Sequence, residues 1–231
     1  LYNVYETLVK MDADGKIKPL LAQRWDVSSD GLQYTFSLQP GAKFASGTAV
    51  DAKAVAAGLD RRGRARTHPL DAGGDRLGVE RMRTSTSATI KAALAPIDTV
   101  SAQSDGTVLV KLKQPSNAWL YSMTSTPGII VDPAVTDMAT APMGSGPFTY
   151  SKWTKGDSIT LDVNADYWGD KPSNGGVVYQ YYADPTALNN AVLTGAVDLV
   201  TSQSNPDSLA EFEAAGFEII EGTSTTKELL A

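Results

Sequence analysis

The two carboxylates that could most readily support catalysis are Asp157 and Asp162, which flank a predicted hairpin. A pair of acids can hydrolyse glycosides when their surroundings make one a general acid and the other a base or nucleophile. Here one acid lies on a turn and the other at an outward strand position, with no neighbour that would divide these roles. His68, the only histidine, has no cysteine or paired carboxylates near it in the sequence, which argues against a metal site or a general base. The sequence therefore favours non-catalytic binding over a secreted hydrolase, and we expect no metal and no cofactor.

The turn Gly144-Ser145-Gly146 has glycines spaced as in a short phosphate-binding loop. A P-loop also needs a Lys-Ser/Thr pair, which is absent, and Pro147 would block the helix whose N-terminus holds the phosphate. The residues themselves predict a tight turn that leads into a strand.

The aromatic residues Trp153, Tyr167 and Trp168 lie beside predicted turns, where rings can stack on sugars or line a peptide pocket. Rings exposed in one plane would favour a secreted carbohydrate-binding or adhesion module. Buried rings would instead indicate core packing at the end of a hairpin, which we expect here.

The net charge of −6 and the pI near 4.8 argue against a nucleic-acid partner, because such partners are bound by neutralising phosphates. The stretch 60–90 has no clean periodicity and contains the basic cluster Arg61, Arg62, Arg64 and Arg66. This cluster offers a site for a polyanion, but a solvated loop is the preferred interpretation. The chain has no cysteine, which excludes disulfides and thiol catalysis.

The elements that would position these residues begin with a hairpin about Asp30-Gly31. Tyr34, Phe36 and Leu38 alternate with polar residues, the period-2 pattern of a half-buried strand. Thr48 and Asp51 then have the spacing of a helix cap, and Val50–Leu59 has helical spacing. Further hairpins are predicted about Asp105-Gly106 and about Lys155-Gly156-Asp157.

The last sixty residues alternate strands and helices. Strands are predicted at Val177–Tyr182, Val197–Val200 and Phe217–Ile220. A helix capped by Asp184 with Pro185 at its first position separates the first two, and a helix opened by Asn205-Pro206 separates the last two. This order predicts a parallel βαβαβ unit with right-handed crossovers.

Three motifs together carry a family resemblance. The first is W-x-V-S-x-D-G-L-x-Y-T-F-x-L-x-P-G-x-K-F-x-x-G-T from Trp25 to Thr48, and the second is N-x-x-Y-W-x-x-K-P from Asn164 to Pro172. The third is the Gly144–Phe148 turn, similar to a G-T-G-P-[YF] motif. They resemble the extracellular solute-binding proteins of ABC importers, specifically the peptide/nickel-binding family, also called family 5.

The resemblance implies a mixed α/β fold: a periplasmic-binding-protein-like lobe with the parallel βαβαβ unit and a β-rich subdomain. It implies that residues 1–9 and 140–231 form the main lobe and that residues 10–139 form the inserted β-rich subdomain. It also implies that the second ligand-binding lobe and any signal sequence or lipid anchor lie outside this N-terminal lobe fragment. We therefore expect an extracytoplasmic monomer that passes a small solute, such as a peptide, to a membrane permease.

The same resemblance implies candidate ligand-binding residues. The segment N-x-Y-E-x-L-V places Tyr5 and Glu6 near the ligand cleft in this family, and the turn Gly144, Ser145 and Gly146 returns to the main lobe close to that cleft. The alternative is that Tyr5 packs, Glu6 is solvated and the turn is structural. With one cleft wall absent, we expect the isolated chain to bind ligand weakly.

Overall fold

The computed structural model of the 231-residue chain describes residues 2–59, 88–134, 142–201 and 208–220. His68 and the Arg61–Arg66 cluster lie outside these ranges. The chain divides into two compact units: residues 1–153 with 159–178 form unit 1, and residues 154–158 with 179–231 form unit 2.

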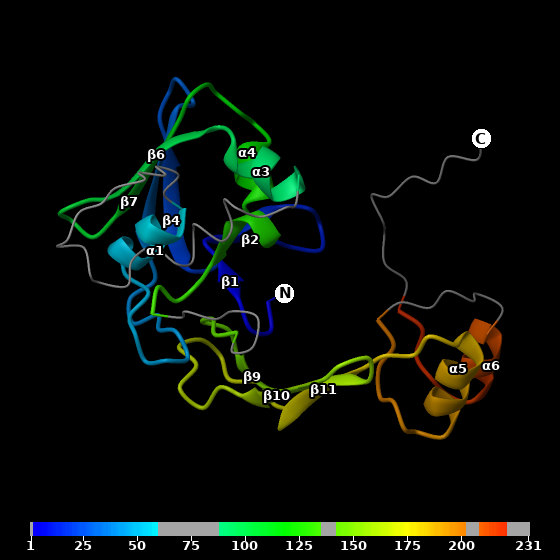
Figure 1. Ribbon diagram of the computed structural model, residues 1–231. Coiled ribbons are helices and arrows are strands. Elements are labelled where there is room, and N and C mark those ends of the chain that lie inside the picture. The colour runs from blue at the N-terminus through cyan, green and yellow to red at the C-terminus, as the bar shows by residue number, and fades with distance from the viewer. Residues whose placement is uncertain (1, 60–87, 135–141, 202–207, 221–231) are drawn as a thin grey trace, which may run out of the picture. The chain divides into compact units, whose positions relative to one another are not determined.

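The largest sheet of unit 1 has four strands in the order β4-β5-β7-β6 (Figure 1). Its neighbouring strands are all antiparallel, and Trp25 pairs with Phe36, which in turn pairs with Val108. The tight turn after β4 needs a residue with positive φ, and Gly31 supplies it with φ of 69°. The two hairpins predicted here are confirmed. Their strands are β4 (Ala22–Val27), β5 (Gln33–Leu38), β6 (Ile97–Ala102) and β7 (Val108–Leu112).

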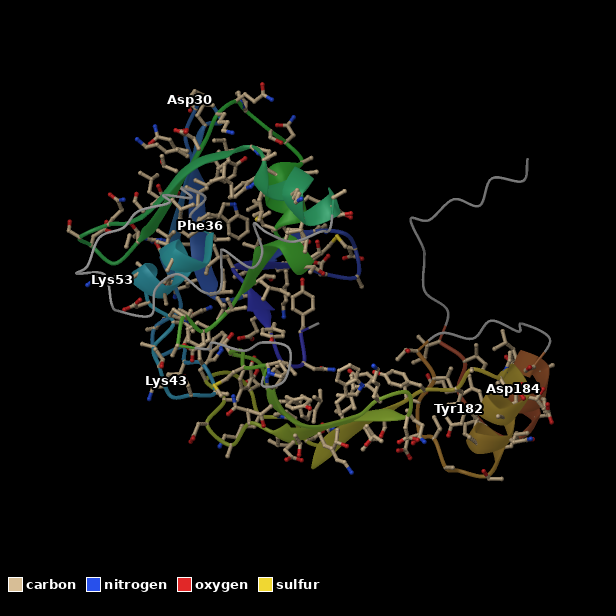
Figure 2. All side chains as sticks on the ribbon, viewed as in Figure 1. Asp30, Phe36, Lys43, Lys53, Tyr182 and Asp184 are labelled. Carbon is tan, nitrogen blue, oxygen red and sulfur yellow. The ribbon has the colours of Figure 1, made fainter. Side chains whose placement is uncertain are left out.

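The core of unit 1 lies on one face of this sheet. The side chains of Phe36 and Trp119 are 1% and 2% exposed, and the ring of Tyr34 contacts Trp119 in a tilted arrangement with ring centroids 4.7 Å apart. Figure 2 labels Phe36 in this interior, whereas Asp30 lies at the tip of the β4–β5 turn. The predicted alternation of β5 is confirmed at Tyr34 and Phe36, which are buried, whereas Leu38 at the end of the strand is only partly buried. The helices of this unit are α1 (Ala52–Leu59), α3 (Ala88–Leu94), α4 (Trp119–Ser122) and the short 3-10 helix η1 (Thr126–Gly128).

The start of α1 differs in detail from its prediction. Asp51 Oδ1 accepts a hydrogen bond from the backbone N of Ala54 at 2.8 Å, so Asp51 satisfies a free amide of the first turn. The side chain of Thr48 instead accepts from Ser46 Oγ in the preceding turn. Thr48 is therefore not the cap, because the helix begins at Ala52, three residues later than a cap at Thr48 would place it.

Short strand pairs hold the N-terminal segment in unit 1. Strand β1 (Glu6–Thr7) pairs antiparallel with β8 (Ile129–Ile130), and β2 (Val9–Met11) pairs antiparallel with β3 (Ile17–Pro19). Val9 and Thr7 are fully buried. The first ten residues are thus packed into the same unit as the four-stranded sheet.

A separate sheet has the strand order β11-β10-β9. Its strands are β9 (Phe148–Thr154), β10 (Ser158–Val163) and β11 (Gly176–Gln180). Helix α5 (Pro185–Leu193) follows, and Asp184 Oδ1 accepts from the backbone N of Thr186 at 2.8 Å, as the cap prediction requires. Figure 2 labels Asp184 at this end of the helix. Helix α6 (Leu209–Ala214) is the second predicted helix, although its expected opening at Asn205-Pro206 lies outside the described residues.

The parallel βαβαβ unit is not present in the described residues. Val197–Val200 and Phe217–Ile220 have no strand assignment, and β11 pairs with β10 instead of with either of them. A strand exists only where another backbone accepts and donates its hydrogen bonds, and neither segment has such a neighbour here. The prediction of a mixed α/β chain is confirmed, whereas the prediction of its parallel unit is wrong for this structure.

The predicted domain boundaries also differ from the compact units. Residues 1–9 and 140–153 lie in the same unit as residues 10–139, because β1 pairs with β8 and Val9 joins the core around Phe36. The division into a main lobe and an inserted subdomain stays a prediction.

Replacing Phe36 by alanine should lower the free energy of unfolding by about 3–5 kcal/mol, because a fully buried ring leaves a cavity against Trp119. Urea unfolding followed by tryptophan fluorescence measures this change. Lys53→Ala, on the exposed side of α1, is the control and should change the free energy of unfolding by less than about 0.5 kcal/mol. Equal effects of the two substitutions would contradict the assignment of the core.

Candidate functional site

The most unusual side chain of unit 1 is the carboxylate of Glu6, which is only 2% exposed. Its oxygens accept three hydrogen bonds: from Ser145 Oγ at 2.8 Å, from Tyr167 OH at 2.8 Å and from Trp168 Nε1 at 2.9 Å. All three donors are uncharged. We call these four residues the Glu6 cluster.

Ser145 reaches Glu6 because two glycines let its turn lie directly on the N-terminal segment. The backbone N of Gly146 donates to the carbonyl oxygen of Val4 at 3.0 Å. A Cβ atom at Gly144 would overlap that same carbonyl group, and a Cβ at Gly146 would lie 2.7 Å from the carbonyl oxygen of Asn3. Only glycine therefore allows this close approach of two backbones.

The two aromatic donors are positioned by Asn164, which is 6% exposed. Its Nδ2 donates to the carbonyl oxygen of Gly146 at 3.0 Å, and its Oδ1 accepts from the backbone N of Asp166 at 3.2 Å. Its carbonyl oxygen accepts from the backbone N of Tyr167 at 3.1 Å. Asn164 thus connects the glycine turn to the loop that carries both rings.

Burial has the largest effect on the pKa values of Glu6 and Tyr167 in this cluster. Desolvation raises the pKa of Glu6, while the hydrogen bonds from Trp168, Tyr167 and Ser145 and the charge of Lys10 act in the opposite direction. Burial also raises the pKa of Tyr167 well above its usual range, and the carboxylate of Glu6 adds to that shift. Tyr167 therefore stays a hydrogen-bond donor at any physiological pH.

The arrangement holds three segments of the backbone together, and the hydrogen bonds of its polar groups are directed to one another. Among the described residues, Glu6 has no lysine or arginine within ion-pair distance, and its three partners occupy most of the acceptor positions of a carboxylate. The described part of the chain also contains no group of three or more metal-ligating side chains. Nor do the described helices include one long and apolar enough to span a bilayer.

The five residues predicted as ligand-binding come together in one place. Glu6 and Ser145 bond directly, and Gly144 and Gly146 lie against the backbone of residues 3–5. The half-buried ring of Tyr5 lies beside Gly144, and burial raises the pKa of its hydroxyl to about 12. The alternative of a solvated Glu6 is wrong. Ligand contact by any of the five stays a prediction.

Sequence analysis missed two features of this site. It did not find Asn164 as a positioning residue, and it did not pair Tyr167 and Trp168 with Glu6. The available signal was the motif N-x-x-Y-W itself, in which an asparagine precedes two aromatic donors by the length of one turn. That signal does not identify the acceptor, which lies more than 160 residues away in the sequence.

The other candidate chemistries receive no support. Asp157 and Asp162 are both exposed. Asp157 Oδ2 accepts a hydrogen bond from the adjacent Ser158 Oγ, and the carbonyl oxygen of Asp157 accepts from the backbone N of Tyr181. Trp153 is 49% exposed, but Tyr167 and Trp168 direct their polar atoms to the buried Glu6. The three rings therefore do not form one exposed plane, which removes the argument for a carbohydrate-binding module.

Glu6→Gln tests the electrostatics through its pH dependence. The folded-state pKa of Glu6 lies above its unfolded value of about 4.3, so folded protein binds this proton more tightly than unfolded protein does. Protonation of Glu6 therefore adds to the free energy of unfolding. This contribution is fully present below about pH 4 and is lost as the pH rises through the pKa of Glu6 in the folded protein. Glutamine does not titrate. The free energy of unfolding of wild type minus that of Glu6→Gln should therefore fall as the pH rises above about 4.

Urea unfolding of both proteins at several pH values measures this difference. If the difference in free energy of unfolding instead increases with pH, the hydrogen bonds lower the pKa of Glu6 by more than burial raises it.

Gly144→Ala should destabilise unit 1 by about 1–3 kcal/mol, because its new methyl group would overlap the carbonyl group of Val4 and force the two backbones apart. Gly175→Ala is the matched control, since a Cβ there meets no atom within 4 Å. Differential scanning calorimetry compares the two variants. A Gly144→Ala protein as stable as Gly175→Ala would mean that the turn does not lie against residues 3–5.

Comparison with protein families gives one broad match. The model described as bacterial extracellular solute-binding proteins, family 5 Middle, matches residues 16–231. It therefore covers the four-stranded sheet, the glycine turn and the loop of Tyr167 and Trp168.

Curated relatives and a solved structure agree with this match. The glutathione-binding protein GsiB of Pectobacterium atrosepticum is 31% identical over 71% of this chain and 29% of its own length. The nickel-binding periplasmic protein of Escherichia coli is 30% identical over 85% of this chain and 35% of its own length. The crystal structure of NikA from Brucella suis in complex with Fe(III)-EDTA has a TM-score of 0.75 and 27% identity, over 93% of this chain and 41% of that one.

The chain thus spans about a third of the length of the two curated relatives. The fold likeness confirms the predicted periplasmic-binding-protein-like class. Because the family model covers almost all of the described residues, the chain belongs to the bacterial extracellular solute-binding proteins of family 5, a family of transport proteins and not of enzymes.

Proposed function

We propose that this chain is part of the substrate-binding component of an ABC importer, which captures a peptide or a similar small solute outside the cytoplasm and delivers it to a membrane permease. The observation that carries the proposal is the family match over residues 16–231. The names of the relatives support a small solute as ligand, since they include glutathione-binding, peptide-binding and nickel-binding proteins. The protein acts as a monomer on the outer side of the membrane, either free or lipid-anchored.

The Glu6 cluster supports this function by making one surface rigid. Glu6, Ser145 and Asn164 hold the glycine turn in place, and the half-buried Tyr5 ring lies against Gly144. A wall fixed before the ligand arrives loses little conformational entropy on binding, which favours affinity. In this proposal Tyr5 and the Gly144–Gly146 turn contact the solute, and Glu6 is a positioning residue that acts through Ser145.

Thermal-shift measurements test the proposal with glutathione, a mixed tripeptide, nickel(II)–histidine and cellobiose as probes. They compare the protein encoded by the complete gene with the 231-residue chain, because binding sites bury most of the ligand surface and a single wall binds weakly. One of the first three probes should raise the melting temperature of the complete protein, with little effect on the 231-residue chain. Stabilisation by cellobiose alone would favour a carbohydrate-binding function instead.

Tyr5→Ala should weaken binding of the active probe by about tenfold, as expected from the loss of roughly 1.4 kcal/mol of contact free energy. Tyr121→Ala, which removes a tyrosine that is 49% exposed on α4, is the control and should leave the affinity unchanged. Isothermal titration calorimetry measures both. Unchanged affinity in Tyr5→Ala would remove Tyr5 from the binding surface.

A further inference from the structure

Asn174 is the only asparagine of the sequence that is followed by a glycine. Asn174 and Gly175 are both exposed, and they lie in unit 1 directly before β11 begins at Gly176 (Figure 1). The side chain of an asparagine ends in an electrophilic carbonyl carbon, Cγ. The backbone nitrogen of the next residue becomes a nucleophile when it loses its proton, so the two groups react where both are accessible.

The backbone nitrogen of Gly175 is accessible. Within the part of the chain that the structure describes, it donates no hydrogen bond. A Cβ atom at Gly175 would meet no atom within 4 Å beyond its neighbours in the chain, so water reaches this position and can accept the proton. Glycine also has no side chain that would shield its nitrogen from an approaching carbonyl carbon.

The side chain of Asn174 is held close to this nitrogen. Its Nδ2 donates to the carbonyl oxygen of Gly176 at 2.8 Å, and this hydrogen bond lies at the surface. The bond spans the peptide unit of Gly175, so the side-chain amide and the nitrogen belong to the same turn, which gives the proximity that an intramolecular reaction needs. Water competes with an exposed hydrogen bond, so this bond does not prevent the side chain from rotating onto the nitrogen.

The Asp-Gly pairs of the described residues differ from this pair in the state of the nitrogen. They are Asp14-Gly15, Asp30-Gly31 and Asp105-Gly106, and each also has a side-chain carbonyl carbon before a glycine. In all three, the glycine N donates to the backbone carbonyl oxygen three residues earlier, at 2.9–3.1 Å. An N–H that is engaged in a turn hydrogen bond keeps its proton. Of these four pairs, Asn174-Gly175 alone therefore has its nucleophile free.

We propose that Asn174 is a modification site, at which the folded protein deamidates spontaneously to a mixture of aspartate and isoaspartate. This change is independent of solute capture, because it needs only the residues of the turn and water. No redox partner takes part in it.

The reaction has two steps. In the first, the nitrogen of Gly175 gives its proton to hydroxide and forms a bond to Cγ of Asn174. The bond between Cγ and Nδ2 breaks, and Nδ2 takes a proton from water and leaves as ammonia, so that a cyclic succinimide remains. In the second, one water molecule opens the succinimide. Opening at Cγ gives aspartate, and opening at the main-chain carbonyl carbon gives isoaspartate, in which the main chain runs through Cβ and Cγ.

Both products change the entry to β11. A carboxylate has no proton to donate to the carbonyl oxygen of Gly176, so the hydrogen bond from position 174 is lost, and one negative charge is added to the formal net charge of −6. Isoaspartate also lengthens the main chain next to Gly176, where a Cβ atom would lie only 2.9 Å from the carbonyl oxygen of Leu161 on β10. Because this contact is so close, we expect the pairing of β10 with β11 to loosen at this end.

Peptide mass spectrometry of the purified protein, incubated at neutral and at mildly alkaline pH, tests the modification without any ligand. Asn174 should lose its amide at a rate that rises with hydroxide concentration. The rate in the folded protein should be less than about tenfold below that in urea, since the exposed turn reacts without unfolding. A failure of the solute-binding proposal would not alter this result.

Asn164 is the internal control in the same samples. It is 6% exposed, and its Nδ2 and Oδ1 are both hydrogen-bonded, so it should keep its amide in the folded protein. Labelling of the incubated protein by a purified isoaspartyl methyltransferase should detect isoaspartate. Aspartate without isoaspartate at position 174, or a rate in the folded protein more than about tenfold below that in urea, would overturn the inference.

Gly175→Ala is the matched variant. Its new methyl group meets no atom within 4 Å, and the φ of Gly175 lies outside the left-handed region, so the melting temperature should stay unchanged. The same methyl group lies beside the attacking nitrogen and should slow the loss of the amide by about tenfold or more.

Anion-exchange chromatography of incubated samples measures this difference. Wild type should develop a more acidic peak at the elution position of Asn174→Asp, whereas Gly175→Ala should not. A folded Gly175→Ala protein that develops the acidic peak as fast as wild type would show that the nitrogen of residue 175 does not attack Asn174.

Discussion

The burial of the Glu6 carboxylate is the constraint on which the arrangement of unit 1 depends. A charge removed from water must be compensated, and here three neutral donors compensate it without a lysine or arginine among its hydrogen-bond partners. The donors come from two segments that follow β8 and β10. Glu6 can therefore be buried only if β1, the glycine turn and the loop of Tyr167 and Trp168 all occupy their places together. Loss of one segment would leave a buried acid without its partners.

This constraint connects two parts of unit 1 that differ in how they are stabilised. The four-stranded sheet is held by apolar packing around Phe36 and Trp119, which is non-directional and needs no single partner. The region around Glu6 is held by directional hydrogen bonds, which fix positions more narrowly. A solute-binding surface needs fixed positions more than it needs additional burial. In the proposed function, the polar cluster fixes the positions of Tyr5 and the glycine turn, and the apolar core supports them.

Unit 2 shows the opposite situation, because its backbone requirements are not met by the described chain. Its helices α5 and α6 form, since their hydrogen bonds lie within each helix. The segments 197–200 and 217–220 remain without strand assignment, since a strand takes its hydrogen bonds from another strand. Leu199 and Ile220, which lie in these segments, are 72% and 80% exposed.

The sequence alone determined the features that depend on nearby residues. The hairpin about Gly31 follows from positive φ at one residue, the inward face of Phe36 from strict alternation, and the start of α5 from an acid followed by proline. Tertiary structure decided the rest. Glu6 meets Ser145 across 139 residues and Trp168 across 162, and no local pattern encodes such a meeting. The predicted strand at Val177–Tyr182 is present as β11, whereas those at Val197–Val200 and Phe217–Ile220 are not. Periodicity specifies which face of a segment is apolar but not whether a partner strand is present.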